Sequence, residues 1–505
     1  MKPPVIRRSG IFRRDRERGI TMVLVALAMV AIVAMAALSI DVITLYLARE
    51  EAQRSADSAA LAAARLISLS GIMGDPSNTT TLWSQICGGA SSPATQVAQA
   101  VAQQNAVAGT AIATASINVK YSAGIGGTIT SSPDCSTLVS ATSPFGLNPM
   151  VTVQIRQTGL PTFFSRIWGN TGNTVSATAT AEAFNPSNSG NVGNQTSGTI
   201  TPVQPRCVKP WVVPNLDPLN PSSTCTTATD CVPFVSKTDG HIMNPGISLN
   251  GGNATGVIGE TFWLVTICKR FGSACALRIQ PQANYYVDPI KPYLEPQPNL
   301  LYLPGQAPSI NPVAVPSCAV SGSSYEQAIE GCDQSTQYQC GVQSTSSVSP
   351  NLVDLSVNPG LATGDTMNGV KCLIHQEDEN TINASTGQDT VSPFAQPSAY
   401  PFQILAGDNS PLIGAGLAAG SPITSSNSIV SLPIYDQTAG IILSTGTTPI
   451  TIVGFLQVFV NAVDPYGNVK VTVLNVAGCG NGNGTPPGTA VTGNSPVPVR
   501  LITPP

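Results

Sequence analysis

The sequence predicts an α+β protein: an N-terminal transmembrane helix continuing into a long helix, a small domain with a helix and an antiparallel sheet, and a β-rich, sandwich-like C-terminal body. Three observations lead to this fold class. Residues 20–40 contain no charge, several later segments alternate apolar and polar residues, and only 10% of the chain is charged. Soluble globular domains average roughly 25% charged residues. With 46 Gly and 42 Pro as well, the composition favours a loop-rich extracellular body over a cytosolic enzyme.

The charge-free run of 21 residues is close to the roughly 20 residues that a helix needs to cross a bilayer. Residues 1–19 carry a net charge of +5, and the remainder of the chain carries −9. The positive-inside rule therefore predicts a cytoplasmic tail at 1–19, a span at 20–40 and the rest outside. An acidic body also argues against nucleic-acid binding.

A cleaved signal peptide is the alternative for the same segment, since residues 34–36 read Ala-Met-Ala. The apolar run is longer than a usual signal core, and helix-forming sequence follows it without a Gly or Pro break. Both features favour a retained anchor.

Residues 41–70 predict a membrane-proximal, alanine-rich helix. Small residues recur there at three- and four-residue spacing, which places Ala52, Ala56, Ala59 and Ala63 on one stripe. Such a stripe lets another backbone approach closely. Two readings stay open: the stripe packs on a partner helix, including a second copy in a homo-oligomer, or it packs on the protein's own first domain.

Residues 71–185 predict a pilin-like α+β domain. Pro93 begins a short helical pattern, and segments 116–123, 150–157 and 173–184 alternate like strands. Residues 186–202 have no apolar periodicity and predict a linker. In the β-rich periplasmic domain expected at 203–505, residues 451–463 and 469–476 flank Asp-Pro-Tyr-Gly, which predicts a hairpin with a type I turn.

All 12 cysteines lie between Cys87 and Cys479, which indicates an oxidising compartment and disulfide bonds. Proximity along the chain suggests three short-range pairs: Cys225–Cys231, Cys268–Cys275 and Cys332–Cys340.

Two segments resemble the TadE/TadG-like proteins of Flp (Tad) pilus systems, and the remainder of the chain looks similar to the C-terminal regions of TadG-like proteins. In the first, Arg18-Gly19 precedes the span, Asp41 follows it, and Tyr46 leads into the alanine-rich helix. In the second, residues 160–184 contain a Phe-Phe motif, a Gly and an alternating small-residue strand. The resemblance implies a single-pass protein of the bacterial inner membrane that assists pilus assembly without enzymatic activity. Its implied partners are the lipid bilayer and Tad pilus assembly proteins or pseudopilins.

Pseudopilins of such systems are cut after a Gly that has Glu at the fifth following position. Gly19 is present here, but the fifth position is Leu24. The sequence leaves open whether the N-terminus is retained or cleaved after Gly19 or Ala36. A membrane-tethered, adhesin-like binding module on the same anchor is the alternative function.

Motifs for chemistry are weak, and the sequence predicts no catalytic, cofactor-binding or metal-binding residue. Ser248 lies in a six-residue Gly-to-Gly segment, one residue too long for a nucleophile elbow. His375 precedes an acidic run at 377–379, which a solvated turn explains better than a metal site. Asp354 begins an imperfect metal-adhesion motif that ends in Asn358.

Overall fold

The structure is a computed structural model. It describes residues 15–70, 73, 81–122, 131–139, 145, 149–162, 164, 169, 172–183, 203–219, 232–237, 240–244, 256–266, 298–304, 312–313, 323–333, 338, 352–354, 362–376, 387–391, 404–413, 416–437, 447–479, 491–493 and 496–502.

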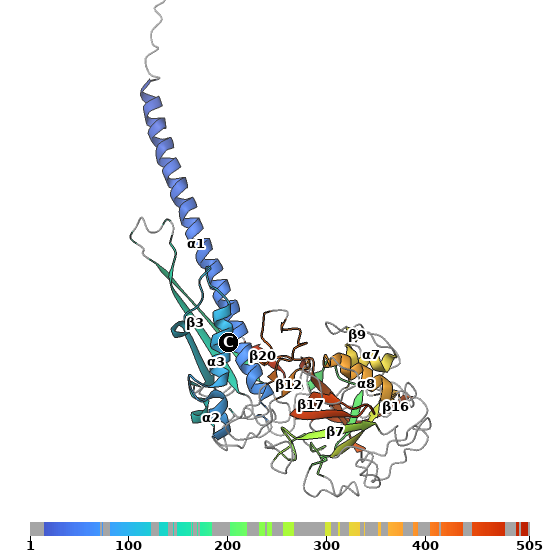
Figure 1. Cartoon of the computed structure of the whole chain (residues 1–505). Helices are drawn as coiled ribbons and strands as arrows, with labels where there is room; N and C mark the ends of the chain where they lie inside the picture. Colours follow the sequence, from blue (N-terminus) through green and yellow to red (C-terminus); the bar gives the residue numbers. More distant parts are fainter. Residues whose placement is uncertain are drawn as a thin grey trace, which may run out of the picture. The chain divides into compact units, whose positions relative to one another are not determined.

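The long N-terminal helix predicted from the sequence is confirmed. Helix α1 runs from Asp15 to Leu69 without interruption, and it is the blue helix of Figure 1. Its 55 residues correspond to roughly 80 Å of helix. After Gly19, α1 contains neither Gly nor Pro. The helix therefore continues unbroken from the apolar run into the alanine-rich stretch.

The predicted short helix and strands after α1 are also present. The elements here are α2 Thr81–Cys87, α3 Pro93–Gln104, the 3₁₀ turns η2 Thr114–Ser116 and η3 Cys135–Leu138, β1 Ile117–Ser122, β2 Ser131–Ser132, β3 Met150–Leu160 and β4 Asn173–Ala183. They contribute to a sheet with the strand order β2-β1-β3-β4-β20.

The last strand of that sheet, β20 Val499–Ile502, comes from far along the chain. It pairs antiparallel with β4, placing Arg500 opposite Glu182. The Arg500 Nε lies 2.8 Å from the Glu182 carboxylate, whose side chain is buried. The strand order thus joins segments more than 300 residues apart.

A disulfide joins Cys87 at the end of α2 to Cys135 at the start of η3. It closes a loop with a sequence separation of 48 residues, and proximity along the chain had not suggested this pair. Cys207, Cys372 and Cys479 are disulfide-bonded too, and none of the described cysteines is free. Oxidised cysteines are therefore confirmed. The three expected short-range pairs each involve a residue outside the described part of the chain.

The strands after residue 200 centre on a closed barrel. Its order is β15-β17-β18-β7-β8-β6, and a parallel β15–β6 pair closes it. The barrel strands are β6 Trp211–Pro214, β7 Thr261–Thr266, β8 Asn299–Pro304, β15 Ile429–Tyr435, β17 Ile452–Val463 and β18 Val469–Gly478. Strands β15, β17 and β18 are buried along almost their whole length, so both of their faces are covered.

Smaller elements accompany the barrel. They are β5 Val203–Pro205, β9 Pro312–Val313, α7 Ser324–Glu330, β10 Cys332–Asp333, β11 Leu352–Asp354, α8 Ala362–Leu373, β12 Thr390–Val391, β13 Ile404–Leu405, β14 Pro422–Ile423, β16 Thr447–Pro449 and β19 Val491–Gly493. Helices α7 and α8 pack against each other, and α8 also contacts β17.

The predicted hairpin is confirmed as β17–β18. The Asp464 carboxylate accepts from the backbone N–H groups of Tyr466 at 2.9 Å and Asn468 at 2.8 Å. Gly467 donates to the Asp464 carbonyl at 3.0 Å, and Gly467 has φ +76°, a conformation that favours glycine. One aspartate thus holds most of the turn.

The strand-rich body is as expected, but its sandwich-like arrangement is corrected to a barrel. Alternation and apolar runs identify strands without specifying how their edges meet. Here the parallel contact of Ile434 with Val213 joins the two edges. The expected domain boundaries at 71–185, 186–202 and 203–505 stay predictions.

Candidate membrane-anchoring site

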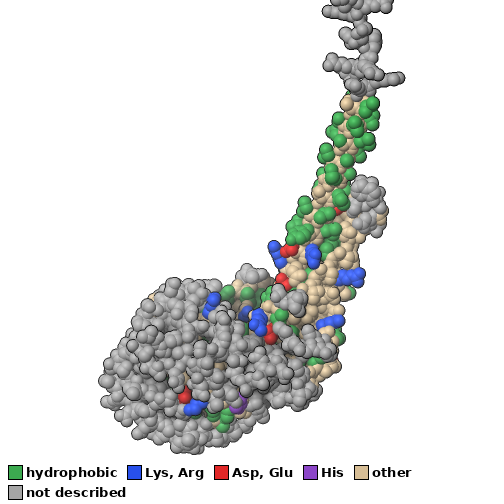
Figure 2. All heavy atoms as spheres, turned by 180° about the vertical axis from the view of Figure 1, so that it is seen from behind, with side chains coloured by type: hydrophobic (Ala, Val, Ile, Leu, Met, Phe, Trp, Pro, Cys, Tyr) green, Lys and Arg blue, Asp and Glu red, His purple; other side chains and the backbone are tan. Residues whose placement is uncertain are grey.

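From Ile20 to Leu47, α1 exposes apolar side chains almost all round. Figure 2 shows hydrophobic side chains over this length of the helix, with charged side chains appearing beyond it. The exposed large residues run from Ile20, at 64% exposure, to Leu47, at 56%. Among the described residues, α1 is the one helix long and apolar enough to cross a membrane. A water-soluble helix would hide such a surface against a core.

Asp41 is the acidic residue that ends the charge-free run, and its side chain is buried. Both carboxylate oxygens accept from the backbone N–H of Phe164, at 3.1 and 3.3 Å. Thr44 donates to the Asp41 carbonyl at 2.9 Å. A carboxylate beside an apolar span is costly without a donor, and this contact supplies one. It connects two positions that the sequence resemblance singled out separately, Asp41 and the Phe-Phe motif.

Beyond Leu47 the character of α1 changes from exposed apolar to buried small residues. Ala52, Ala56, Ala59 and Ala63 all have 0% exposure, and Ala60, Ala64 and Ile67 are equally buried. The stripe is therefore covered by the protein's own chain. This burial supports the reading in which the stripe packs on the protein's own domain over the one in which it packs on a partner helix or a second copy.

Hydrogen bonds fix the middle of α1 beside residues 101–118 and 154–178. Ser55 donates to the Ala102 carbonyl at 3.1 Å, and Gln53 donates to the Thr178 carbonyl at 3.1 Å. The Glu51 carboxylate accepts from the Ala108 N–H at 2.7 Å. All three bonds join a side chain of α1 to a backbone group, so they depend on where the neighbouring backbone lies and not on a partner side chain.

The C-terminal end of α1 is held by a second set of contacts, to the C-terminal half of the chain. Ser68 donates to the Val497 carbonyl at 2.8 Å, and Arg65 donates to the Thr424 carbonyl at 2.9 Å. Asn475 of β18 donates to the Ser68 carbonyl at 2.7 Å and to Gln457 of β17 at 2.7 Å. Ser68, Gln457 and Asn475 are all buried. We call Ser68, Gln457 and Asn475, with the hydrogen bonds that join them, the α1 latch.

Sequence reasoning did not predict the α1 latch. One sequence feature could have indicated it: Gln457 and Asn475 are amide residues within largely apolar strands. Buried amides in such a position need partners. The partner segment, however, lies about 400 residues earlier.

Lys209 is a second buried polar site that the sequence did not mark. Its ammonium donates to the carbonyls of Ile329 and Gly331, both at 2.6 Å, at the C-terminal end of α7. Burial lowers the pKa of Lys209 to about 7, and the charge of Glu330 opposes that shift. The contacts are those of a cation at a helix C-terminus, which makes Lys209 a support for α7.

Of the residues in the weak chemical motifs, the structure describes His375 and Asp354. The ring Nε2 of His375 lies 2.9 Å from the Asn427 side-chain amide. Burial lowers the pKa of His375. Ser248, residues 377–379 and Asn358 lie outside the described residues, as does all of the metal-adhesion motif after Asp354. No group of three or more His, Cys, Asp or Glu gathers at one point in the described part of the chain.

The exposed apolar face, the Asp41 contact and the buried alanine stripe all fall within one segment of α1. Residues 19–66 match the family model described as "Putative Flp pilus-assembly TadE/G-like". This confirms the suspected TadE/TadG-like family for the anchor helix. A comparison with curated proteins gives no match, and a comparison with solved structures gives none either. The Tad match therefore gives the anchor segment a pilus-assembly association.

Proposed function

We propose that the protein is a structural, non-enzymatic component that assists Flp pilus assembly while anchored in the bacterial inner membrane. Residues 1–19 lie in the cytoplasm, residues 20–40 cross the bilayer, and the body lies in the periplasm. The observation that carries the proposal is the family match over residues 19–66, on a helix whose apolar face is exposed up to Leu47.

Helix α1 supports this role by being one continuous element with two surfaces. Its exposed apolar part suits lipid, and its buried alanine part is covered by the chain's own domains. The α1 latch ties the end of the same helix to two barrel strands. Tad assembly proteins or pseudopilins are the proposed partners.

The topology is tested by fusing alkaline phosphatase after residue 505. We expect an active enzyme and a protein that sediments with membranes and resists extraction by alkaline carbonate. N-terminal sequencing of the mature protein checks retention of the anchor. A soluble periplasmic species beginning near Ala37 would show instead that residues 1–36 are a signal peptide.

The role in assembly is tested by comparing three strains: a deletion, one with the span at 20–40 replaced by an unrelated transmembrane helix, and one with the body secreted behind a cleavable signal. We expect surface pili to be lost in the deletion and secreted strains and kept in the helix-replacement strain. Normal pilus numbers in the deletion strain, together with lost attachment to surfaces, would favour the adhesin-like alternative.

A further inference from the structure

The exposed apolar surface of α1 continues past Asp41. Beyond it, four large side chains are each more than half exposed: Val42, Ile43, Tyr46 and Leu47. The next charged residue is Arg49, and the Asp41 side chain is buried, so the exposed surface of α1 carries no charge from residue 20 to residue 48. From Ile20 to Leu47 this surface is roughly 42 Å long. It is therefore longer than the hydrocarbon core, about 30 Å, and matches a bilayer with its headgroup layers, about 40–45 Å.

A short connection joins β3 to β4, and we call four of its residues the β3–β4 tip: Pro161, Thr162, Phe164 and Gly169. Pro161 and Gly169 are exposed, and Phe164 is half-buried. The sequence of residues 161–172 contains three aromatic residues and no Asp or Glu. Aromatic residues are enriched where a membrane meets water, and the lack of acidic residues avoids repulsion by anionic headgroups. The composition of this connection therefore suits a membrane surface.

The β3–β4 tip lies beside the last apolar turns of α1. Gln53 of α1 donates to the Thr178 carbonyl of β4. Further toward the N-terminus of the helix, Asp41 accepts from the Phe164 N–H at 3.1 and 3.3 Å. The two contacts are twelve residues apart on α1, which corresponds to roughly 18 Å along the helix. Leu47 lies between them, so the chain that leads to the tip accompanies exposed apolar turns of α1 over its last 9 Å or so, roughly six residues of helix.

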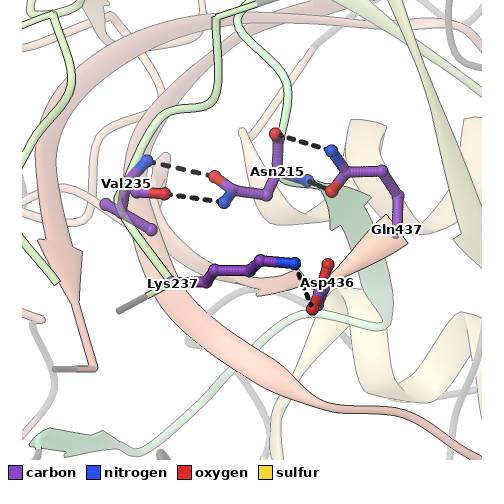
Figure 3. Close-up of polar contacts among 5 residues, drawn as sticks. All are labelled: Asn215, Val235, Lys237, Asp436 and Gln437. Atoms are coloured by element: carbon purple, nitrogen blue, oxygen red, sulfur yellow. Dashed lines mark hydrogen bonds and ion pairs between the residues drawn. The ribbon is translucent and has the colours of Figure 1, made fainter. Parts of the chain in front are cut away.

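The bond between Asp41 and the tip suits a position at the edge of a membrane. In the barrel, Figure 3 shows a carboxylate bonded near water: Asp436 pairs with the Lys237 ammonium at 3.5 Å, and the Lys237 side chain is 54% exposed. At Asp41 the donor is the uncharged N–H of Phe164, and α1 has no Lys or Arg in residues 19–48. Irregular backbone close to lipid needs partners for its polar groups. One bond thus satisfies both the Phe164 N–H and the carboxylate.

We propose that the β3–β4 tip is a second membrane contact of the protein, which lies in the periplasmic headgroup layer beside the last apolar turns of α1. The inference rests on the membrane anchoring proposed above and adds a contact that does not belong to the helix. Lipid is the occupant because the exposed surface of α1 continues from the span to Leu47 without a charged side chain. Contacts in the interfacial layer set the tilt and rotation of a spanning helix. The tip therefore fixes how α1 is turned in the bilayer.

The test uses the full-length protein in vesicles of phosphatidylethanolamine and phosphatidylglycerol. In each variant one exposed position is replaced by p-azidophenylalanine, which carries a nitroxide label without involving the native cysteines. The positions are Val30 in the span, Ile43 beyond Asp41, Pro161 in the tip and Gln154 as the matched control. Gln154 lies on β3, seven residues before Pro161, which corresponds to roughly 23 Å of extended chain. Collisions of the label are measured with oxygen, which concentrates in lipid, and with a water-soluble nickel chelate.

We expect the oxygen-to-nickel collision ratio at Pro161 to be several-fold higher than at Gln154 and close to that at Ile43. A ratio at Pro161 as low as at Gln154 would overturn the inference, because the tip would then lie in water. Protection of Pro161 from both reagents would overturn it too, since a protein partner or a second copy would then cover the tip. A low ratio at Val30 would instead refute the anchor itself. Should the Pro161 variant fail to fold, a label at the exposed Thr158 decides, because its ratio must also exceed that at Gln154.

Discussion

The double substitution Ala56→Leu and Ala59→Leu tests what the buried stripe of α1 does. Both side chains have 0% exposure, so each leucine must fit three additional carbon atoms into a closed space. Overpacking of this kind costs about 1–3 kcal/mol per site. Leucine and alanine differ little in helix propensity, so the cost does not come from the helix itself.

The two sites are neighbours on one helix, so their costs need not add. A combined loss of about 2–5 kcal/mol is a large part of the roughly 5–15 kcal/mol that stabilises a typical domain. We therefore expect a protein that reaches the membrane but is digested by protease in spheroplasts, with a lower steady-state level. Surface pili should fall in proportion to the protein level. Ala62→Leu, a half-buried position on the same helix, serves as the matched control.

The informative contrast lies between protein level and pilus number. If the double variant had normal level and normal protease resistance but no pili, the stripe would be a partner interface and the packing argument would be wrong. If pili and protein both remained normal, the stripe would tolerate added volume, contrary to its complete burial.

Further predictions concern single features. Lys209→Met should cost about 1–3 kcal/mol in urea unfolding, because it removes the donor from the end of α7 and leaves the Ile329 and Gly331 carbonyls buried without it. Replacing Cys87 and Cys135 by serine should lower stability by about 4 kcal/mol in thermal unfolding, from the closure entropy of a 48-residue loop. Burial first, and the charges of its acidic neighbours second, raise the pKa of Glu326 to about 7, so the folded state binds its proton more tightly than the unfolded state. Stability should therefore fall as pH rises from about 4.5 to 7, and Glu326→Gln should flatten that slope. Asp464→Ala removes three hydrogen bonds of the turn, from the Tyr466 N–H, the Asn468 N–H and the Asn468 side chain, and should cost about 1–3 kcal/mol in the same urea assay.

Local sequence patterns predicted the elements of this fold well because each is specified by neighbouring residues. A charge-free run predicted the first part of α1, Pro93 marked the start of α3, and Asp-Pro-Tyr-Gly predicted the β17–β18 turn. In each case the side chains that decide the structure lie within a few positions of one another.

The arrangement of the elements escaped prediction because it depends on contacts between distant residues. The barrel closes where Val213 meets Ile434, and no local pattern distinguishes that edge from a free one. Lys209 looks like any surface lysine in the sequence, although the carbonyls of α7 bury it. The alanine stripe was visible, but a small-residue surface is equally suited to an internal and an external partner.

The pairing of β20 with β4 has a consequence for the order of folding. Strand β4 is synthesised about 300 residues before Val499, and chains grow at about 5–20 residues per second. For roughly 15–60 seconds, the backbone groups of β4 that later bind β20 therefore have no partner from their own chain. An unpaired strand edge readily accepts another extended segment. The edge of β4 is open to such pairing during that interval, and the arrival of β20 closes it.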